Sequence, residues 1–270
     1  MDELKVHNHG FVRLVDTMPQ KNLDNAIVQA ARVSYGDGTK SSRSDRGLIR
    51  YLLRHWHTTP FEMVEFKFHL KMPLFVARQH LRHRMASVNE VSARYSEVRD
   101  EFFVPGEFRK QGVVNRQGSS GVVDTNNDMI EFLEEHNTNS YSSYMATMEE
   151  DGVCREQARM ILPQTMYTEF YWKINLHNLM HYLHLRMDNH AQEEIRDYAC
   201  AIFHLIRPLL PHTMEAFKDF RLDMVHLTGP EVRALKAGKT ELEDSPGENR
   251  EFKEKVKNLN LQPIQWGDLE

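Results

Sequence analysis

The chain has 270 residues, with 34 Lys and Arg against 39 Asp and Glu, which gives a formal net charge of −5. This negative balance argues against a protein that binds nucleic acid through a broad positive surface, although it leaves room for a local basic site. Hydrophobic residues make up 40% of the chain and no apolar run approaches the ~20 residues of a spanning helix, so we expect a globular protein without a membrane segment.

The first elements are indicated by the spacing of apolar residues. Helices are expected over Lys21–Tyr35 and Asp45–Trp56, because apolar residues recur there at helical spacing. Apolar and polar residues alternate through Val64–Met72, which predicts a half-buried strand with one wet face. Pro73 suits the first turn of a following helix that we expect to reach His83.

The middle of the chain predicts one more strand and then mostly helices. Arg94–Val104 is expected to be a second long strand, and Gly106–Asp128, rich in Gly, Ser, Asn and Asp, a long surface loop. Helices are expected over Met129–Glu150 and Arg155–Leu162. Thr168–His204 is expected to be mostly helical, with an apolar stripe in its second half.

The composition changes near the C-terminus. Residues Gly229–Glu270 are dense in charge and interrupted by Gly and Pro, with a helix expected at Glu248–Leu259. We therefore divide the chain into a domain over 1–228 and a charged extension over 229–270. Expected helices outnumber expected strands, and the elements do not repeat in β-α-β order, which indicates the α+β class.

The start of the chain and its cysteines suggest the cellular compartment in which the protein is found. Met1–Lys5 is an acidic start without the apolar core of a signal peptide. Cys154 and Cys200 are too few for a disulfide framework and do not have C-x-x-C spacing. We expect two inert thiols in a reducing, cytoplasmic compartment.

A basic patch at Arg78–Arg94 is the stretch that carries chemistry. It holds four arginines and one acid: Arg78, Arg82, Arg84, Arg94 and Glu90. Guanidinium forks match phosphate oxygens, and Ser87, Asn89 and Ser92 add directional hydrogen bonds. The mixture favours a phosphorylated small molecule with a polar ring. The alternative is a salt-bridged helix end followed by a polar loop.

Several short blocks around this patch follow one another in a recognisable order. They are His57-Thr58-Thr59-Pro60-Phe61-Glu62, Ala77-Arg78-Gln79, Arg82-His83-Arg84 with Ser92 after seven further residues, Asn89–Ser96, Ala158–Pro163 and Leu185–Ile195. Over about residues 10–224 the chain resembles the flavin-dependent thymidylate synthases, which carry H-x-T/S-P-F-E, R-H-R-x7-S, A-R-x-x-L-P and L-R-x-D-x-H-A-Q-x-E-I segments.

The resemblance implies an activity and an architecture. The activity is reductive methylation of dUMP to dTMP, with the one-carbon unit from 5,10-methylenetetrahydrofolate and the hydride from FADH2. NADPH would re-reduce the flavin, and tetrahydrofolate would be the other product. The architecture is one helix-rich α+β catalytic domain with a small antiparallel sheet, assembled as a homotetramer with active sites at subunit interfaces.

The resemblance also implies site residues. The dUMP site would be formed by Gln79, Arg82, Glu90, Ser92, Arg94, Arg159 and Arg186. The FAD site would be formed by Thr59, Arg82, His83, Arg84, Glu90, Asn175, His177 and His181, with His57 near flavin and folate. Arg186 would be the catalytic residue. Negative charge builds on uracil when its C5 attacks the methylene carbon, and a fixed guanidinium can stabilise that charge.

Two other functions stay open at this point. His177, His181 and His184 share a helix face at i, i+4 and i+7, which suggests a metal site of a hydrolase. No pattern of the H-E-x-x-H type surrounds them, so we expect no metal, and the resemblance implies flavin contact instead. The patch at Arg78–Arg94 could instead bind single-stranded nucleic acid with strongly salt-dependent affinity. The net charge and scattered aromatic residues argue against a nucleic-acid partner.

Overall fold

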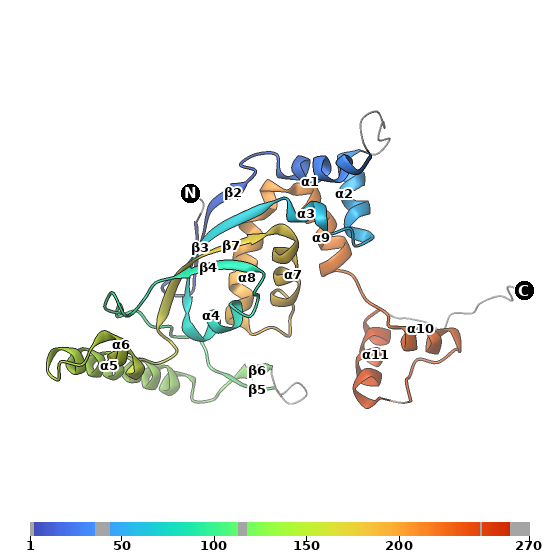
Figure 1. Cartoon of the computed structure of the whole chain (residues 1–270). Coiled ribbons are helices and arrows are strands. Elements are labelled where there is room, and N and C mark those ends of the chain that lie inside the picture. Colours follow the sequence, from blue (N-terminus) through green and yellow to red (C-terminus); the bar gives the residue numbers. More distant parts are fainter. Residues whose placement is uncertain (1–2, 36–43, 113–117, 244, 260–270) are drawn as a thin grey trace, which may run out of the picture. The chain divides into compact units, whose positions relative to one another are not determined.

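The computed structural model describes residues 3–35, 44–112, 118–243 and 245–259. They divide into two compact units, Met1–Leu222 and Asp223–Glu270. Helices and an antiparallel sheet make up the first unit (Figure 1), so the expected α+β class is confirmed.

A five-stranded antiparallel sheet forms the centre of the first unit, in the order β1-β2-β3-β7-β4. The strands are β1 (Glu3–Val6), β2 (Gly10–Met18), β3 (Glu65–Pro73), β4 (Ala86–Glu90) and β7 (Tyr167–Asn175). The alternation seen in the sequence of β3 is confirmed, because Phe66, Phe68 and Leu70 are fully buried. Strands β1 and β2 lay outside the sequence-based expectations.

Three helices pack against this sheet. They are α4 (Leu74–His80), α7 (Leu176–Arg186) and α8 (Glu193–Ile206), and α7 lies beside α8 (Figure 1). The apolar stripe expected in this part is confirmed by α8, where Ile195, Tyr198 and Ile202 are fully buried. Burying one such side chain stabilises the fold by about 2 kcal/mol relative to leaving it exposed.

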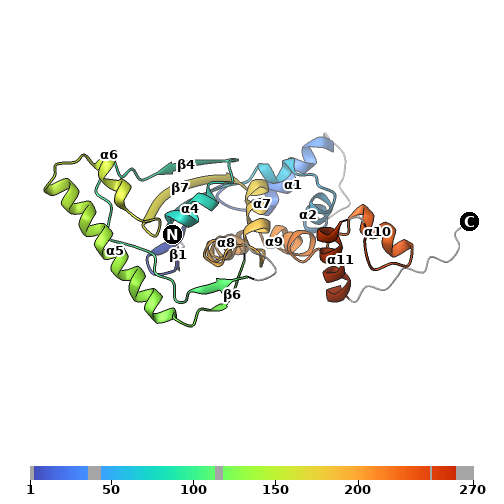
Figure 2. The ribbon, with the colours of Figure 1, turned by 90° about the horizontal axis from the view of Figure 1, so that it is seen from below.

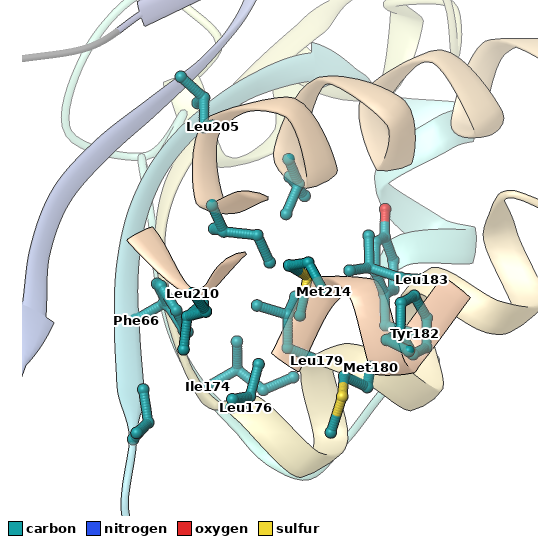
Figure 3. Close-up of a cluster of buried hydrophobic side chains, with 14 of the residues drawn as sticks. Phe66, Ile174, Leu176, Leu179, Met180, Tyr182, Leu183, Leu205, Leu210 and Met214 are labelled. Carbon is teal, nitrogen blue, oxygen red and sulfur yellow. The ribbon is translucent and has the colours of Figure 1, made fainter. Parts of the chain in front are cut away.

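A second group of helices packs together next to the sheet. It comprises α1 (Leu23–Arg32), α2 (Asp45–Arg54), α3 (Thr59–Glu62) and α9 (Pro211–Phe217). Figure 3 shows how Phe66 and Ile174 of the sheet, Leu179 of α7 and Met214 of α9 lie in one buried cluster. The two helices expected before β3 are confirmed, with a short 3-10 turn over Val33–Tyr35 ending the first.

The remaining helices of the first unit lie side by side. Helix α5 (Asn126–Glu149) contacts α6 (Arg155–Ala158), which continues into a 3-10 turn over Arg159–Ile161 (Figure 2). Both elements were expected from the sequence. The helix expected to reach His83 ends at His80 and is followed by a turn.

The strand expected over Arg94–Val104 is wrong. The described backbone there forms one isolated bridge, between Phe102 and Met166, and the strand of this region is β4, upstream of it. The reason lies in helix α5, because the Tyr141 hydroxyl donates to the Val98 carbonyl and the Val98 N–H donates to the Tyr144 hydroxyl. Side chains thus satisfy backbone groups that a neighbouring strand would otherwise pair with.

Two further expectations need correction. The segment expected to be mostly helical from Thr168 begins with the strand β7. The outward-facing side chain of β7 at Tyr171 is aromatic and stacks on His69, so the sequence does not show a clear alternation of apolar and polar residues. The loop expected over Gly106–Asp128 contains a hairpin of β5 (Arg109–Gln111) and β6 (Ser119–Val122), and its residues 113–117 lie outside the described ranges.

The second unit is a pair of helices with a core of its own. Helix α10 (Gly229–Lys236) starts with a capping box between Thr228 and Glu231, and Lys255 of α11 (Pro246–Leu259) pairs with Glu231 at 2.8 Å. Its core consists of buried Ala234, Leu235 and Phe252. The helix expected at Glu248–Leu259 is confirmed, while residues 260–270 of the expected extension lie outside the described ranges.

The helices were also compared with the length of a membrane span. Over the described ranges, no helix combines the length and the apolar character needed to cross a bilayer.

Candidate active site

The structure gathers the residues proposed for the site into three groups. The first surrounds Arg186 at the end of α7, the second lines a cavity beside the end of β4, and the third lies after helix α2. Each group is positioned by the end of a helix or strand, where side chains can leave the packed core.

Arg186 is held at the C-terminal end of α7 by groups from α4 and the turn after it. Its Nε donates to His83 Nε2 at 3.0 Å, and its Nη2 lies 3.5 Å from the Gln79 carbonyl oxygen. The Gln79 side chain donates to Gln192 at 2.5 Å. Three residues expected at the site, Gln79, His83 and Arg186, are therefore brought together.

His83 is a neutral hydrogen-bond acceptor in this group. Burial and the charge of Arg186, together with nearby His181, lower the pKa of His83 from 6.5 to about 4. Because its Nε2 accepts from Arg186, the proton of the neutral ring lies on Nδ1. A neutral ring in this tautomer fixes the direction of the guanidinium.

A second histidine lies underneath this contact. His80 is completely buried, and burial, with the charges of His83 and Arg186, lowers its pKa to about 3. Its Nδ1 lies 3.0 Å from the Tyr182 hydroxyl, and the ring of Tyr182 meets the His83 ring edge-on at 4.9 Å. The side chains of His80, Tyr182 and His83 therefore pack one against the next, and this row connects Arg186 with the core.

Several arginines of the basic patch, and Arg186 as well, lack a carboxylate partner. Among the described residues, no carboxylate oxygen lies within 4.0 Å of the guanidinium groups of Arg78, Arg82, Arg84 or Arg186. Arg94, in contrast, pairs with Glu156 at 3.0 Å. Unpaired guanidinium groups beside neutral histidines are a donor set suited to an anionic ligand. The alternative of a salt-bridged helix end does not describe this part of the patch.

The start of α7 carries the other residues expected at the flavin site. The side chain of Asn175 caps the helix by accepting from the Asn178 N–H at 3.0 Å. His177 and His181 follow on the helix, and the His181 ring lies 6.0 Å from the ring of His83. In the described part of the chain, no three His, Cys, Asp or Glu side chains are grouped so that they could hold a metal ion.

The second group lines a cavity of about 540 Å³. Glu90, Ser92 and Arg159, all expected at the dUMP site, contribute to its wall. Buried Thr168 donates its hydroxyl to Glu90 Oε1 at 2.5 Å, and Arg159 Nε donates to the Glu156 carbonyl at 3.2 Å. The cavity thus offers fixed acceptors and one guanidinium without a carboxylate partner among the described residues.

The sequence did not reveal all of this wall. Lys71 also lines the cavity, is only 7% exposed, and pairs with Glu101 at 2.6 Å. From the alternation in β3, we expected Lys71 on the solvent-exposed face of the strand. We expected a helix over the segment that contains Thr168, so the position of Thr168 in β7 was not predicted. Thr168 and Glu101 carry no signal in the sequence that marks them as site residues.

The residues expected at the dUMP site fall into two groups within one chain. Gln79, Arg82 and Arg186 are not part of the lining described for the cavity that holds Glu90 and Ser92. This cavity therefore does not contain the whole expected set.

The third group follows the C-terminal end of α2. A pocket of about 820 Å³ is lined by His57 and Thr59, both expected near the flavin, and by Tyr51. The rings of Tyr51 and His57 are stacked, with centroids 5.9 Å apart and an interplanar angle of 18°. Pro60 in the first turn of the short helix α3 fixes the chain that follows His57.

The two cysteines take no part in these groups. Cys154 is exposed and precedes α6, whereas Cys200 lies on α8, where burial raises the pKa of its thiol. A raised pKa leaves less thiolate at neutral pH, which agrees with the expectation of an inert thiol at Cys200.

Comparison with known proteins identifies relatives over most of the chain. Residues 13–212 match the family described as "Thymidylate synthase complementing protein". A flavin-dependent thymidylate synthase of Dictyostelium discoideum is 51% identical over 266 residues, which cover 95% of this chain and 87% of the relative. A flavin-dependent thymidylate synthase of Thermus thermophilus is 52% identical over 233 residues, covering 86% of this chain and 84% of the relative.

A solved structure has a similar fold. The crystal structure of the UMP/dUMP methylase PolB from Streptomyces cacaoi, bound with 5-Br dUMP, superposes with a TM-score of 0.72 at 33% sequence identity. The match covers 81% of this chain and 99% of the PolB chain.

Proposed function

The chain belongs to the flavin-dependent thymidylate synthase family and methylates dUMP, and from this premise we propose how its residues divide the work. We propose that 5,10-methylenetetrahydrofolate supplies the one-carbon unit and that NADPH reduces the flavin, with dTMP and tetrahydrofolate as products. The observation that carries the proposal is the Arg186 guanidinium, which is fixed by neutral His83 and has no carboxylate partner among the described residues.

The donor set around Arg186 fits FAD. Arg82 and Arg84 without carboxylate partners suit a pyrophosphate, and the rings of His83 and His181 suit a planar heterocycle. We propose that these residues hold FAD together with Thr59, Glu90, Asn175 and His177. When bound and reduced, FAD supplies the hydride that completes the methyl group.

The dUMP site is proposed to combine the cavity with the Arg186 group. Ser92, Arg94 and Arg159 would bind the nucleotide with Glu90 from one side, and Gln79, Arg82 and Arg186 from the other. Arg159 offers a charge-assisted donor for the phosphate. Arg186 would stabilise the negative charge that develops on the uracil ring as C5 attacks, because the guanidinium stays protonated and is already oriented.

We infer that the two groups of dUMP residues meet at a boundary between two copies of the chain. Gln79, Arg82 and Arg186 do not line the cavity that holds Glu90, Ser92 and Arg159, which supports active sites built between subunits. We propose a homotetramer, as the resemblance implied. The catalytic domain would be residues 1–228, with 229–270 as a charged extension, and the cysteine content supports a cytoplasmic location.

Replacing Arg186 tests this function directly. We expect Arg186→Ala to lower the rate of dTMP formation by at least about 100-fold, the size of effect seen when one stabilising donor is removed from an active site. Arg196→Ala is the matched control, since Arg196 lies on neighbouring α8 and, among the described residues, its guanidinium donates only to the Asn189 carbonyl. dTMP formation by Arg186→Ala at the rate of the control would remove Arg186 from the reaction.

A further inference from the structure

Trp56 has a backbone conformation that its residue type rarely adopts. It follows α2 with a φ of 61°, in the left-handed region that favours glycine. The His57 N–H donates to the Leu52 carbonyl at 2.9 Å, and the Trp56 N–H to the Leu53 carbonyl at 3.4 Å. This is the hydrogen-bond pattern of a Schellman motif, in which the left-handed position is usually glycine. Tryptophan is therefore the unfavourable residue for this turn.

An arginine holds the indole in place. The Arg221 guanidinium carbon lies 3.7 Å from the centroid of the Trp56 ring. The same guanidinium donates to the carbonyl oxygens of Leu53 and Phe220, both at 2.6 Å. Leu53 is in the last turn of α2, where a cation interacts favourably with the helix dipole. Arg221 is thus fixed over one face of the indole.

The opposite face of the indole is open. Trp56 is 61% exposed, although one face of its ring is covered by Arg221. Among the described residues, neither Arg54 nor Arg221 has a carboxylate oxygen within 4.0 Å. We call Arg54, Trp56 and Arg221 the Trp56 surface, because the Arg54 guanidinium carbon lies 5.9 Å from the ring centroid of Phe220, the neighbour of Arg221 in the chain. It presents a flat aromatic face with positive charge beside it, and it adjoins His57, which lines the third pocket.

Packing and turn formation do not explain this side chain. An exposed indole contributes little to the core, and glycine would form the same turn without strain. Strain that is retained at an exposed position indicates a functional use of the side chain. The Trp56 ring is covered by arginine on one face and exposed on the other. A planar heterocycle can stack on such an exposed face.

We propose that the Trp56 surface binds a planar nitrogen heterocycle that carries negative charge. The indole would stack on the heterocycle, and Arg54 and Arg221 would attract its carboxylates or phosphates. Folates and NADPH share this chemistry. The proposal rests on the proposed function, because both ligands are co-substrates of that reaction.

The test uses Trp56→Gly in the full-length, flavin-loaded enzyme with dUMP present. Tetrahydrofolate and NADP⁺ serve as separate probes in calorimetric titrations. We expect the Kd of at least one probe to rise about tenfold, the effect of losing one stacking contact. The affected probe identifies the ligand. The Tm should not fall, because glycine relieves the left-handed turn.

Three further variants complete the test. Trp56→Phe keeps a ring and should retain most of the affinity. Trp56→Asn lacks a ring but tolerates the left-handed turn, so it should show the same loss of affinity as Trp56→Gly and replaces that variant if it folds poorly. Arg54→Gln should weaken the same probe and reduce the dependence of its Kd on salt.

Two results would overturn the proposal. One is a Kd within twofold of wild type for both probes in Trp56→Gly and Trp56→Asn. The other is normal probe binding with a changed sedimentation coefficient, which would make Trp56 a contact between protein chains. Neither result bears on dTMP formation by the wild-type enzyme, whose absence would instead contradict the proposed function.

Discussion

At the scale of single residues, the group around Arg186 contains two histidines that carry no charge at neutral pH. His80 and His83 stay neutral because burial and the charge of Arg186 lower the pKa of both, to about 3 and about 4. The sequence indicated His83 through its place between two arginines, but it could not show that His83 accepts from Arg186. That contact joins two residues 103 positions apart in the chain, one in the turn after α4 and the other at the end of α7.

The suppressed charge of His80 predicts a dependence of stability on pH. The unfolded chain takes up a proton at His80 below pH 6.5, whereas the folded chain does so only near pH 3, so stability must fall as the pH falls through this range. From pH 7 to pH 5 we expect His80 to cost on the order of 2 kcal/mol of the free energy of unfolding.

Urea unfolding of His80→Gln at the two pH values measures this contribution. The variant should lose less stability than wild type between pH 7 and pH 5, while His136→Gln, at an exposed histidine, should follow wild type. An equal loss in wild type and His80→Gln would show that His80 is protonated in the folded protein.

Thr168 supports a second prediction at this scale. Its buried hydroxyl donates to Glu90, so Thr168→Val removes the donor while keeping the shape of the side chain. We expect kcat/KM for dUMP to fall roughly tenfold, as is typical when a hydrogen bond to a charged group is lost. Thr168→Ser keeps a hydroxyl and should restore most of the activity. Equal activity of the valine and serine variants would separate Thr168 from the site.

At the scale of elements, the sequence predicts those parts whose pattern is local. The alternation of β3 and the apolar stripe of α8 were readable, because each element buries one side of a regular pattern. Strand β4 was missed since it is an exposed edge with no buried face to mark it. Helix α9 was not expected from the sequence, although Pro211 at its start suits the first turn of a helix.

The contact between β2 and α8 gives a prediction for an element. Gly10 begins β2 beneath the Tyr198 hydroxyl, which donates to the Lys71 carbonyl at 2.8 Å. A Cβ at Gly10 would collide with that hydroxyl and with two backbone oxygens, so Gly10→Ala should destabilise the fold by about 2–3 kcal/mol. Nothing lies within 4 Å of a Cβ at Gly106, which makes Gly106→Ala the control. A Tm of Gly10→Ala equal to that of the control would contradict this packing.

At the scale of the whole molecule, the site expected from the sequence is divided. The motifs predicted which residues belong to it, and the structure places Gln79 and Arg186 in one group and Glu90, Ser92 and Arg159 in another. One chain's sequence carries no information on which copy supplies each group. That the two groups of residues form one site shared between subunits therefore stays a prediction.

Mixing two inactive variants tests the shared site. Arg186→Ala and Arg159→Ala each disable one group, and a hybrid assembly can combine the intact group of each chain. After unfolding and refolding together, random pairing should restore about a quarter of the wild-type activity. A mixture as inactive as its components would show that both groups act within the same chain.

The central claim is that this chain couples flavin oxidation to methylation of dUMP. The most direct measurement is the visible absorption spectrum of the flavin-loaded protein, reduced without oxygen and then mixed with dUMP and 5,10-methylenetetrahydrofolate. We predict that the bands of oxidised flavin return only when both substrates are present, and that dTMP forms in equal amount. Bands that stay bleached with both substrates, or that return without dUMP, would contradict the account.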